Sequence, residues 1–123
     1  MSKLPMIARI LLGLIFVVFG LNGFLNFLPT PPMPEAAGAF AGALAATGYM
    51  FPLIKAIEVI VGILLLTNKF VPLALILLAP ITVNIVLFHA VLAPAGMVLP
   101  IIILVLHVYL ATTYKAAYKP LFS

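Results

Sequence analysis

The sequence has no cysteine and very little charge. Only 7% of its 123 residues are Asp, Glu, Lys or Arg, whereas an average soluble domain is about a quarter charged. The absence of cysteine excludes disulfide scaffolds, thiolate-bound metals, iron–sulfur clusters and dithiol redox chemistry. The net charge of +4 comes from basic residues scattered along an apolar chain, which form no patch for nucleic acid.

Hydrophobic residues dominate what is present. They make up 67% of the chain, and the mean hydropathy is +1.42. A chain this short cannot enclose so much apolar surface in one globular core, because small domains leave much of their surface exposed. We therefore expect a single integral membrane domain over residues 1–123, in contact with the lipid bilayer.

Four apolar stretches approach or exceed the ~20 residues that a transmembrane helix needs. They are Met6–Leu28, Phe51–Thr67, Phe70–Leu92 and Met97–Tyr114. The breaks between them hold prolines at 29–34, a polar turn at 67–69 and a Pro/Gly turn at 93–96, none of which continues a helix. Short connections favour antiparallel neighbours. The expected fold class is therefore all-α, an antiparallel bundle of four transmembrane helices.

A fifth segment, residues 35–47, consists almost entirely of Ala and Gly and is too short to span a bilayer. We expect a short helix here that lies across the outer end of the bundle. The spacing Gly38-x-x-x-Gly42 would allow it to approach other helices closely. The alternative is an ordered loop with one or two helical turns.

The basic residues predict the orientation. Five of the six would lie on one side of the membrane if both termini are cytoplasmic: Lys3, Arg9, Lys69, Lys115 and Lys119. Only Lys55 falls near the outer side. Because cytoplasmic flanks carry the excess of Lys and Arg, we expect the N-terminus and the C-terminus in the cytoplasm.

Few polar residues fall inside the predicted spans, and these are the candidate functional residues. They are Asn22, Asn26, Lys55, Glu58, Asn84, His89 and His107. Lys55 and Glu58 are three residues apart, so they share a helix face and can pair. All except His107 fall near the middle or in the outer half, which predicts a cavity open to the outside.

Each candidate also has a structural interpretation. Lys55 and Glu58 would form a neutralising pair that aids insertion, and the asparagines would join helices by hydrogen bonds. His89 would bind water at the headgroup level, and His107 would be a hydrogen-bonded histidine within the bundle. His89 and His107 lie roughly 15 Å apart along the membrane normal, too far apart to ligate one haem. The sequence has no metal-ligand spacing and no phosphate-loop or nucleophile-elbow motif, so we predict no catalytic residue and no metal site.

The order of these elements resembles the DoxX family of small bacterial membrane proteins. The resemblance rests on the first span, with Arg9, the stretch 12–16 and the stretch 19–23, and on the Glu-then-Gly, Leu-rich stretch 57–66. It implies a four-helix inner-membrane protein connected with quinone or thiol oxidative stress. Many relatives carry a lysine where this chain has Gly23, and Lys55 could substitute for that lysine beside Glu58.

The leading hypothesis is a redox accessory protein that binds a quinone or a similar apolar ring in the outer half of the bundle. Glu58 and His89 would handle protons, while Asn22 and Asn84 would bind carbonyl oxygens. Such a chain would need a partner enzyme and would not act as an enzyme alone. The alternatives are a structural subunit of a larger membrane complex and, with less support, a proton-coupled transporter. A homo-oligomer is compatible with each of these.

Overall fold

The computed structural model describes residues 3–27 and 33–122, and every regular element in these ranges is helical. The helices are α1 (Lys3–Leu25), α2 (Glu35–Ala46), α3 (Met50–Leu66), α4 (Val71–Leu87), α5 (Val98–Thr113) and α6 (Lys115–Tyr118). A π-helical turn, Phe88–Leu92, continues α4, and 3-10 turns follow at Pro94–Gly96 and Lys119–Phe122. The prediction of an all-α fold is confirmed. Residues 28–32, which hold most of the predicted proline-rich break, lie outside the described residues.

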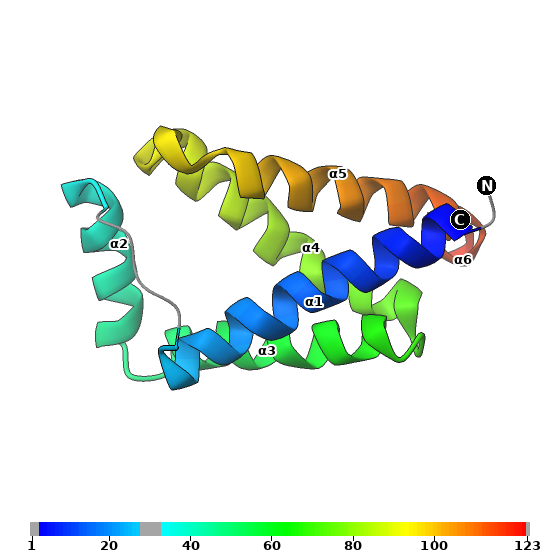
Figure 1. The fold of residues 1–123 in the computed structure, drawn as a ribbon, viewed down its shortest axis with the longest axis horizontal. Coiled ribbons are helices and arrows are strands. Elements are labelled where there is room, and N and C mark those ends of the chain that lie inside the picture. Colours follow the sequence, from blue (N-terminus) through cyan, green and yellow to red (C-terminus); the bar gives the residue numbers. More distant parts are fainter. Residues whose placement is uncertain (1–2, 28–32, 123) are drawn as a thin grey trace.

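The long helices α1, α3, α4 and α5 lie side by side along the length of the molecule (Figure 1). Contacts join α1 to α3, α3 to α4, α4 to α5 and α5 back to α1. The start of α1, the α3–α4 turn and α6 share one end, which we call the basic end because Lys3, Lys69 and Lys115 lie there (Figure 1). The other end, the α2 end, is crossed by α2, which makes an angle of 91° with α3.

Two helical stretches are long and apolar enough to cross a membrane on their own. They are α1, with 23 residues, and Val71–Leu92, with 22 residues, which joins α4 to the π-helical turn. The other two candidates pass only as bent pairs, α2 with α3 and α5 with the segment Lys115–Phe122. By length and composition, residues 3–27 and 33–122 therefore hold two to four candidate membrane spans. The shorter helices α3, with 17 residues, and α5, with 16, match the lengths of the predicted second and fourth spans closely.

Glycines allow α1 and α3 to approach each other closely. A Cβ atom on Gly62 would lie 2.8 Å from the backbone nitrogen of Val17 and 2.9 Å from the carbonyl oxygen of Gly13. Likewise, a Cβ atom on Gly20 would lie 2.7 Å from a methyl group of Val59. Small residues are the usual means by which membrane helices pack backbone to backbone.

Arg9 joins the same two helices at the basic end. Its Nη1 donates hydrogen bonds to the carbonyl oxygens of Leu65 and Leu66, the last two residues of α3. The final carbonyls of a helix have no partner within the helix, so a basic side chain there completes its C-terminus. Arg9 therefore joins α1 to the end of α3, in addition to the effect on membrane orientation that its charge predicts.

The structure changes two expectations. The first helix is predicted to run to Leu28, but α1 ends at Leu25, and Asn26 follows it with a left-handed φ of 52°. A helix is present at 35–46 as predicted, yet a Cβ atom on its Gly38 or Gly42 would meet no atom of the described residues within 4 Å. The Gly38 and Gly42 face of α2 therefore does not pack against the other described helices, and Ala37 is the one buried residue of α2.

Replacing Gly62 by alanine tests the close contact between α1 and α3. The new methyl group would collide with backbone atoms, so we expect the free energy of unfolding to fall by about 1–3 kcal/mol. In Gly38→Ala the methyl group meets open space, and the better helix propensity should leave the stability unchanged or raise it by up to about 1 kcal/mol. Thermal unfolding in detergent would measure both changes in stability. An equal loss of stability in the two variants would contradict the close contact between α1 and α3.

Candidate functional site

A cavity of about 410 Å³ lies between α2, α3 and α4, and we call it the α2 cavity. Its volume falls within the range of small-molecule sites. Three aromatic rings from three different elements line it: Phe40, Phe51 and Phe88. Four of the seven predicted site residues also line it: Lys55, Glu58, Asn84 and His89. The cavity thus combines apolar walls with a few polar groups.

Lys55 and Glu58 form an ion pair on the α3 wall of the cavity. The Nζ atom of Lys55 lies 3.3 Å from Oε1 of Glu58. The Glu58 side chain is only 5% exposed, and that of Lys55 is 21% exposed. The Lys55 ammonium also lies 5.4 Å from the centre of the Phe51 ring, within cation–π range. The buried carboxylate is therefore paired, as a buried charge requires.

Two glycines of α1 provide the space for this pair. A Cβ atom on Gly23 would lie 2.5 Å from Cγ of Lys55, and one on Gly20 would lie 3.2 Å from Cβ of Glu58. The Lys55 side chain therefore occupies the volume that a side chain at position 23 would take. This geometry is compatible with the hypothesis that Lys55 substitutes for a lysine at position 23.

His89 lies in the π-helical turn at the rim of the cavity. Its Nδ1 atom lies 2.8 Å from the carbonyl oxygen of Ile85, which can only accept a hydrogen bond. Nδ1 therefore carries a proton, and in the neutral ring Nε2 is an acceptor. Asn84 lies about one turn earlier in the same helix, with an exposed side chain. π-Helical turns occur frequently at functional sites.

The two asparagines of the first helix do not line the α2 cavity. The backbone N–H of Asn26 donates to the carbonyl oxygen of Asn22 at 2.9 Å, which closes the last turn of α1. Asparagine is one of the few residues that readily adopt left-handed φ. Asn26 therefore lies just beyond the end of α1, so the prediction that it shares a helix face with Asn22 is wrong. Its role as a candidate binding residue stays a prediction. Asn22 is half-buried within α1.

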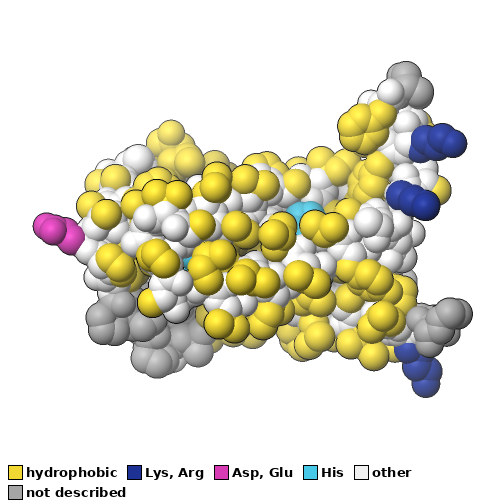
Figure 2. Space-filling view, turned by 90° about the horizontal axis from the view of Figure 1, so that it is seen from above, with side chains coloured by type: hydrophobic (Ala, Val, Ile, Leu, Met, Phe, Trp, Pro, Cys, Tyr) yellow, Lys and Arg dark blue, Asp and Glu magenta, His cyan; other side chains and the backbone are white. Residues whose placement is uncertain are grey.

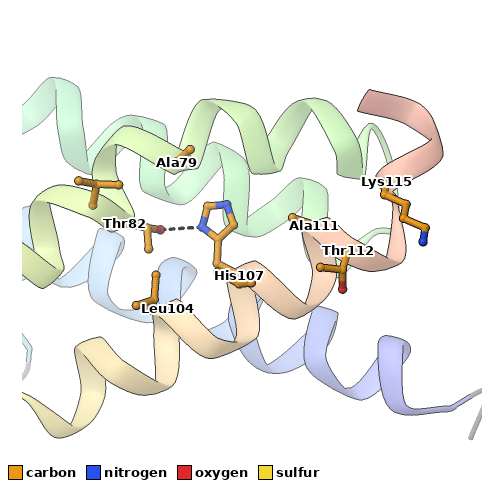
Figure 3. Close-up of a pocket in the computed structure, with 9 residues that line it drawn as sticks. Ala79, Thr82, Leu104, His107, Ala111, Thr112 and Lys115 are labelled. Carbon is orange, nitrogen blue, oxygen red and sulfur yellow. Dashed lines mark hydrogen bonds between the residues drawn. The ribbon is translucent and has the colours of Figure 1, made fainter. Parts of the chain in front are cut away.

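His107 is separate from the α2 cavity and joins α4 to α5 (Figure 3). Its Nε2 atom lies 3.0 Å from the carbonyl oxygen of Leu75, and its Nδ1 atom lies 2.8 Å from the hydroxyl of Thr82. Nε2–H must donate to the carbonyl, so in the neutral ring Nδ1 accepts from the Thr82 hydroxyl. Both nitrogens are satisfied, which favours the structural interpretation of His107.

Sequence reasoning did not identify Thr82 or the aromatic lining of the cavity. A threonine in the third span and a histidine in the fourth are a polar pair on neighbouring helices, which is a weak signal for Thr82. The phenylalanines gave no signal, because phenylalanine is also common where a helix faces lipid. Within residues 3–27 and 33–122, the His, Asp and Glu side chains form no group of three that could hold a metal ion.

Comparison with known proteins gives one match. The family model described as DoxX matches residues 4–91, from near the start of α1 into the π-helical turn that holds His89. The comparisons with curated proteins and with solved structures found no match. The matched range includes all the residues that line the α2 cavity and leaves out α5 and α6.

Exchanging Lys55 and Gly23 tests how the ion pair is built. Lys55→Ala leaves the buried Glu58 without its partner and should lower the unfolding free energy by about 1–3 kcal/mol. Gly23→Lys alone should also destabilise, because it crowds the Lys55 stem. The double variant Gly23→Lys, Lys55→Ala should regain most of the stability that Lys55→Ala loses, as measured by thermal unfolding. A double variant no more stable than Lys55→Ala would show that position 23 cannot supply the ammonium group.

Thr82→Val tests the link between α4 and α5. The variant keeps the side-chain volume but removes the hydroxyl that hydrogen-bonds His107, so stability should fall by about 0.6–1.7 kcal/mol. Thr113→Val is the matched control, because the Thr113 hydroxyl donates only within α5, to the Tyr109 carbonyl. Chemical unfolding in detergent would compare them, and a larger loss in Thr113→Val would contradict the assignment.

Proposed function

The chain belongs to the DoxX family, and we propose that it is a multi-pass protein of the bacterial inner membrane that binds a quinone or similar apolar ring in the α2 cavity. The observation that carries this proposal is the convergence of three aromatic rings and four polar side chains on one cavity. The proposed role is that of a redox accessory protein. Electrons would come from a partner redox protein, since the chain has no cysteine to carry them.

We propose that α1, α3, α4 with its π-helical turn, and α5 each cross the bilayer, in an antiparallel four-helix bundle. All four helices expose large apolar side chains, for example Leu14, Ile63, Leu77 and Val105. Hydrophobic side chains cover the middle of the molecule, and Lys and Arg side chains gather at one end (Figure 2). This distribution supports a cytoplasmic basic end with both termini inside, by the positive-inside rule. The α2 cavity would then face the outer half of the membrane.

The residues of the cavity fit the groups of a quinone. The rings of Phe40, Phe51 and Phe88 offer apolar faces against which a flat ring can stack. The Lys55 ammonium and the Asn84 amide are donors for its carbonyl oxygens. When bound, a quinone supplies two-electron, two-proton redox chemistry. The Glu58 carboxylate and Nε2 of His89 are the groups that can accept hydrogen bonds from hydroxyls and hold protons.

The α4–α5 interface offers a quinone much less. There the polar atoms of His107, Thr82 and the Leu75 carbonyl are already bonded to one another. A ligand would have to break these bonds to gain its own. In the α2 cavity the Asn84 amide and Nε2 of His89 remain on the lining, which favours this site for a polar ring.

Fluorescence quenching tests the proposal, because the chain has no tryptophan and a single introduced one is observed without background. Phe40→Trp places the reporter on the cavity wall, and Phe24→Trp places a control on the exposed side of α1. Titration with a short-chain ubiquinone or menaquinone analogue in nanodiscs should quench the cavity reporter saturably. The control should show only the linear quenching that dissolved quinone causes.

Substitutions in the reporter background identify the binding groups. Asn84→Leu should weaken saturable quenching by the quinone by about tenfold, the effect of losing one hydrogen bond of about 1.4 kcal/mol. Glu58→Gln should weaken quenching by the reduced quinol, whose hydroxyl donates to the Glu58 carboxylate. Glu35→Gln is the matched control, since Glu35 is exposed at the start of α2 and does not line the cavity. Identical linear quenching of both reporters would contradict quinone binding and favour the role of a structural subunit.

A further inference from the structure

A second hollow surface runs between α4 and α5 and opens at the basic end. Its main part is a groove of about 410 Å³, lined by Ala79, Val83, Leu104, Ala111 and Lys115 among others. Figure 3 shows Leu104 near one end of this groove, His107 along it and Lys115 at the other end. An adjoining hollow of about 380 Å³ shares Ala79 and Ala111 with the groove and reaches Tyr118. Away from Lys115 the lining offers a ligand little but apolar surface. The polar atoms of His107 and Thr82 are hydrogen-bonded to each other.

A third hollow, of about 590 Å³, continues from Lys115 onto the C-terminal segment. It is lined by Lys115, Lys119, Tyr118 and Phe122 among others. We call it the lysine hollow. Lys115 lines both this hollow and the groove, so the apolar groove ends where the basic residues begin.

The lysine hollow is held in place by a defined contact. The segment Lys115–Phe122 bends by 75° away from α5. The hydroxyl of Tyr118 donates a hydrogen bond of 2.8 Å to the carbonyl oxygen of Pro72, at the start of α4. This bond fixes the segment against α4. Lys115 and Lys119 are four residues apart, so they extend from one side of it.

The charges of the two lysines are not balanced by the chain's acidic side chains. The sequence has two acidic residues, Glu35 and Glu58, which lie on α2 and α3. Glu58 pairs with Lys55, and Glu35 lies at the α2 end, opposite the basic end. A ligand of complementary charge for the lysine hollow is therefore an anion.

The length of the groove indicates what the apolar part of the ligand is. Leu104 and Lys115 are eleven residues apart, which corresponds to ~16 Å along a helix. Half the hydrocarbon thickness of a bilayer is ~15 Å. In the proposed orientation the groove would extend through one leaflet, from the level of the headgroups to the middle of the membrane. An acyl chain has this length and this apolar character.

We propose that the groove and the lysine hollow bind one phospholipid with an anionic headgroup. Its phosphate lies at Lys115 and Lys119, and one acyl chain lies along the groove toward Leu104 and Val83. The site is on the opposite leaflet from the α2 cavity in the proposed orientation, and it is independent of quinone binding. It gives the two lysines a ligand, beyond their predicted effect on orientation.

Native mass spectrometry of the full chain in detergent tests this site. The probes are dipalmitoyl phosphatidylglycerol and dipalmitoyl phosphatidylcholine, which have the same acyl chains and differ in headgroup charge. We expect one phosphatidylglycerol to be retained preferentially per chain. The double variant Lys115→Gln, Lys119→Gln should reduce its retention by about 30-fold, or about fivefold for each lysine. Lys69→Gln, at the same end but outside the hollow, should not change it.

Filling the groove tests the acyl chain separately. Ala111→Leu and Ala79→Leu place bulk in the groove without changing charge, and both should weaken retention of both lipids. Because Ala79 is exposed, we expect Ala79→Leu to fold normally. Its thermal unfolding midpoint, compared with that of the unchanged chain, checks this. Soluble glycerol phosphate, which has the headgroup chemistry without chains, should not displace the lipid at equal concentration.

Three results would overturn the proposal. If Lys69→Gln lost as much phosphatidylglycerol retention as the double lysine variant, the lipid would be attracted to positive charge in general. Unchanged lipid retention in both leucine variants would show that no chain lies in the groove. Displacement by glycerol phosphate at equal concentration would show a site for phosphate alone.

Discussion

The close approach of α1 and α3 at Gly13, Gly20 and Gly62 is the constraint on which much of the structure depends. It places the Glu58 side chain against Gly20 and brings Lys55 across Gly23. It also brings Arg9 within reach of the last carbonyls of α3 at the basic end. An ion pair, a helix terminus and one wall of the cavity therefore share a single helix contact. A methyl group at any of these glycines would disturb more than packing.

The α2 cavity has one firmly held wall and one lightly held wall. Its α3 wall is fixed by the contact with α1, and Glu58 within it is almost fully buried. Its α2 wall comes from a helix with a single buried residue, Ala37. Local stability follows the number of buried apolar contacts, so opening of the cavity would occur most readily on the α2 side. The polar groups would stay in place while a ligand enters.

The sequence predicts the helical fold and part of the candidate site for identifiable reasons. Clustered prolines and polar turns end helices, although a single proline such as Pro80 lies within α4. A paired lysine and glutamate at i, i+3 must share a face. Such local patterns do not determine how one helix is rotated about its axis relative to its neighbour. For this reason the meeting of Phe40, Phe51 and Phe88, and the outward direction of Gly38 and Gly42, required the structure. The end of α1 was missed because Asn26 fits equally well as a residue inside a span or as a helix terminator.

The gathering of lysine and arginine side chains at the basic end also limits how copies of this chain could assemble (Figure 2). In the proposed orientation every copy enters the membrane the same way up. Two such copies can be related only by a rotation axis perpendicular to the bilayer, since an axis within the membrane plane would invert one of them. Any homo-oligomer would then be a ring or a parallel pair with all its α2 cavities toward one compartment. Its lysine hollows would form a collar around the symmetry axis on the opposite face.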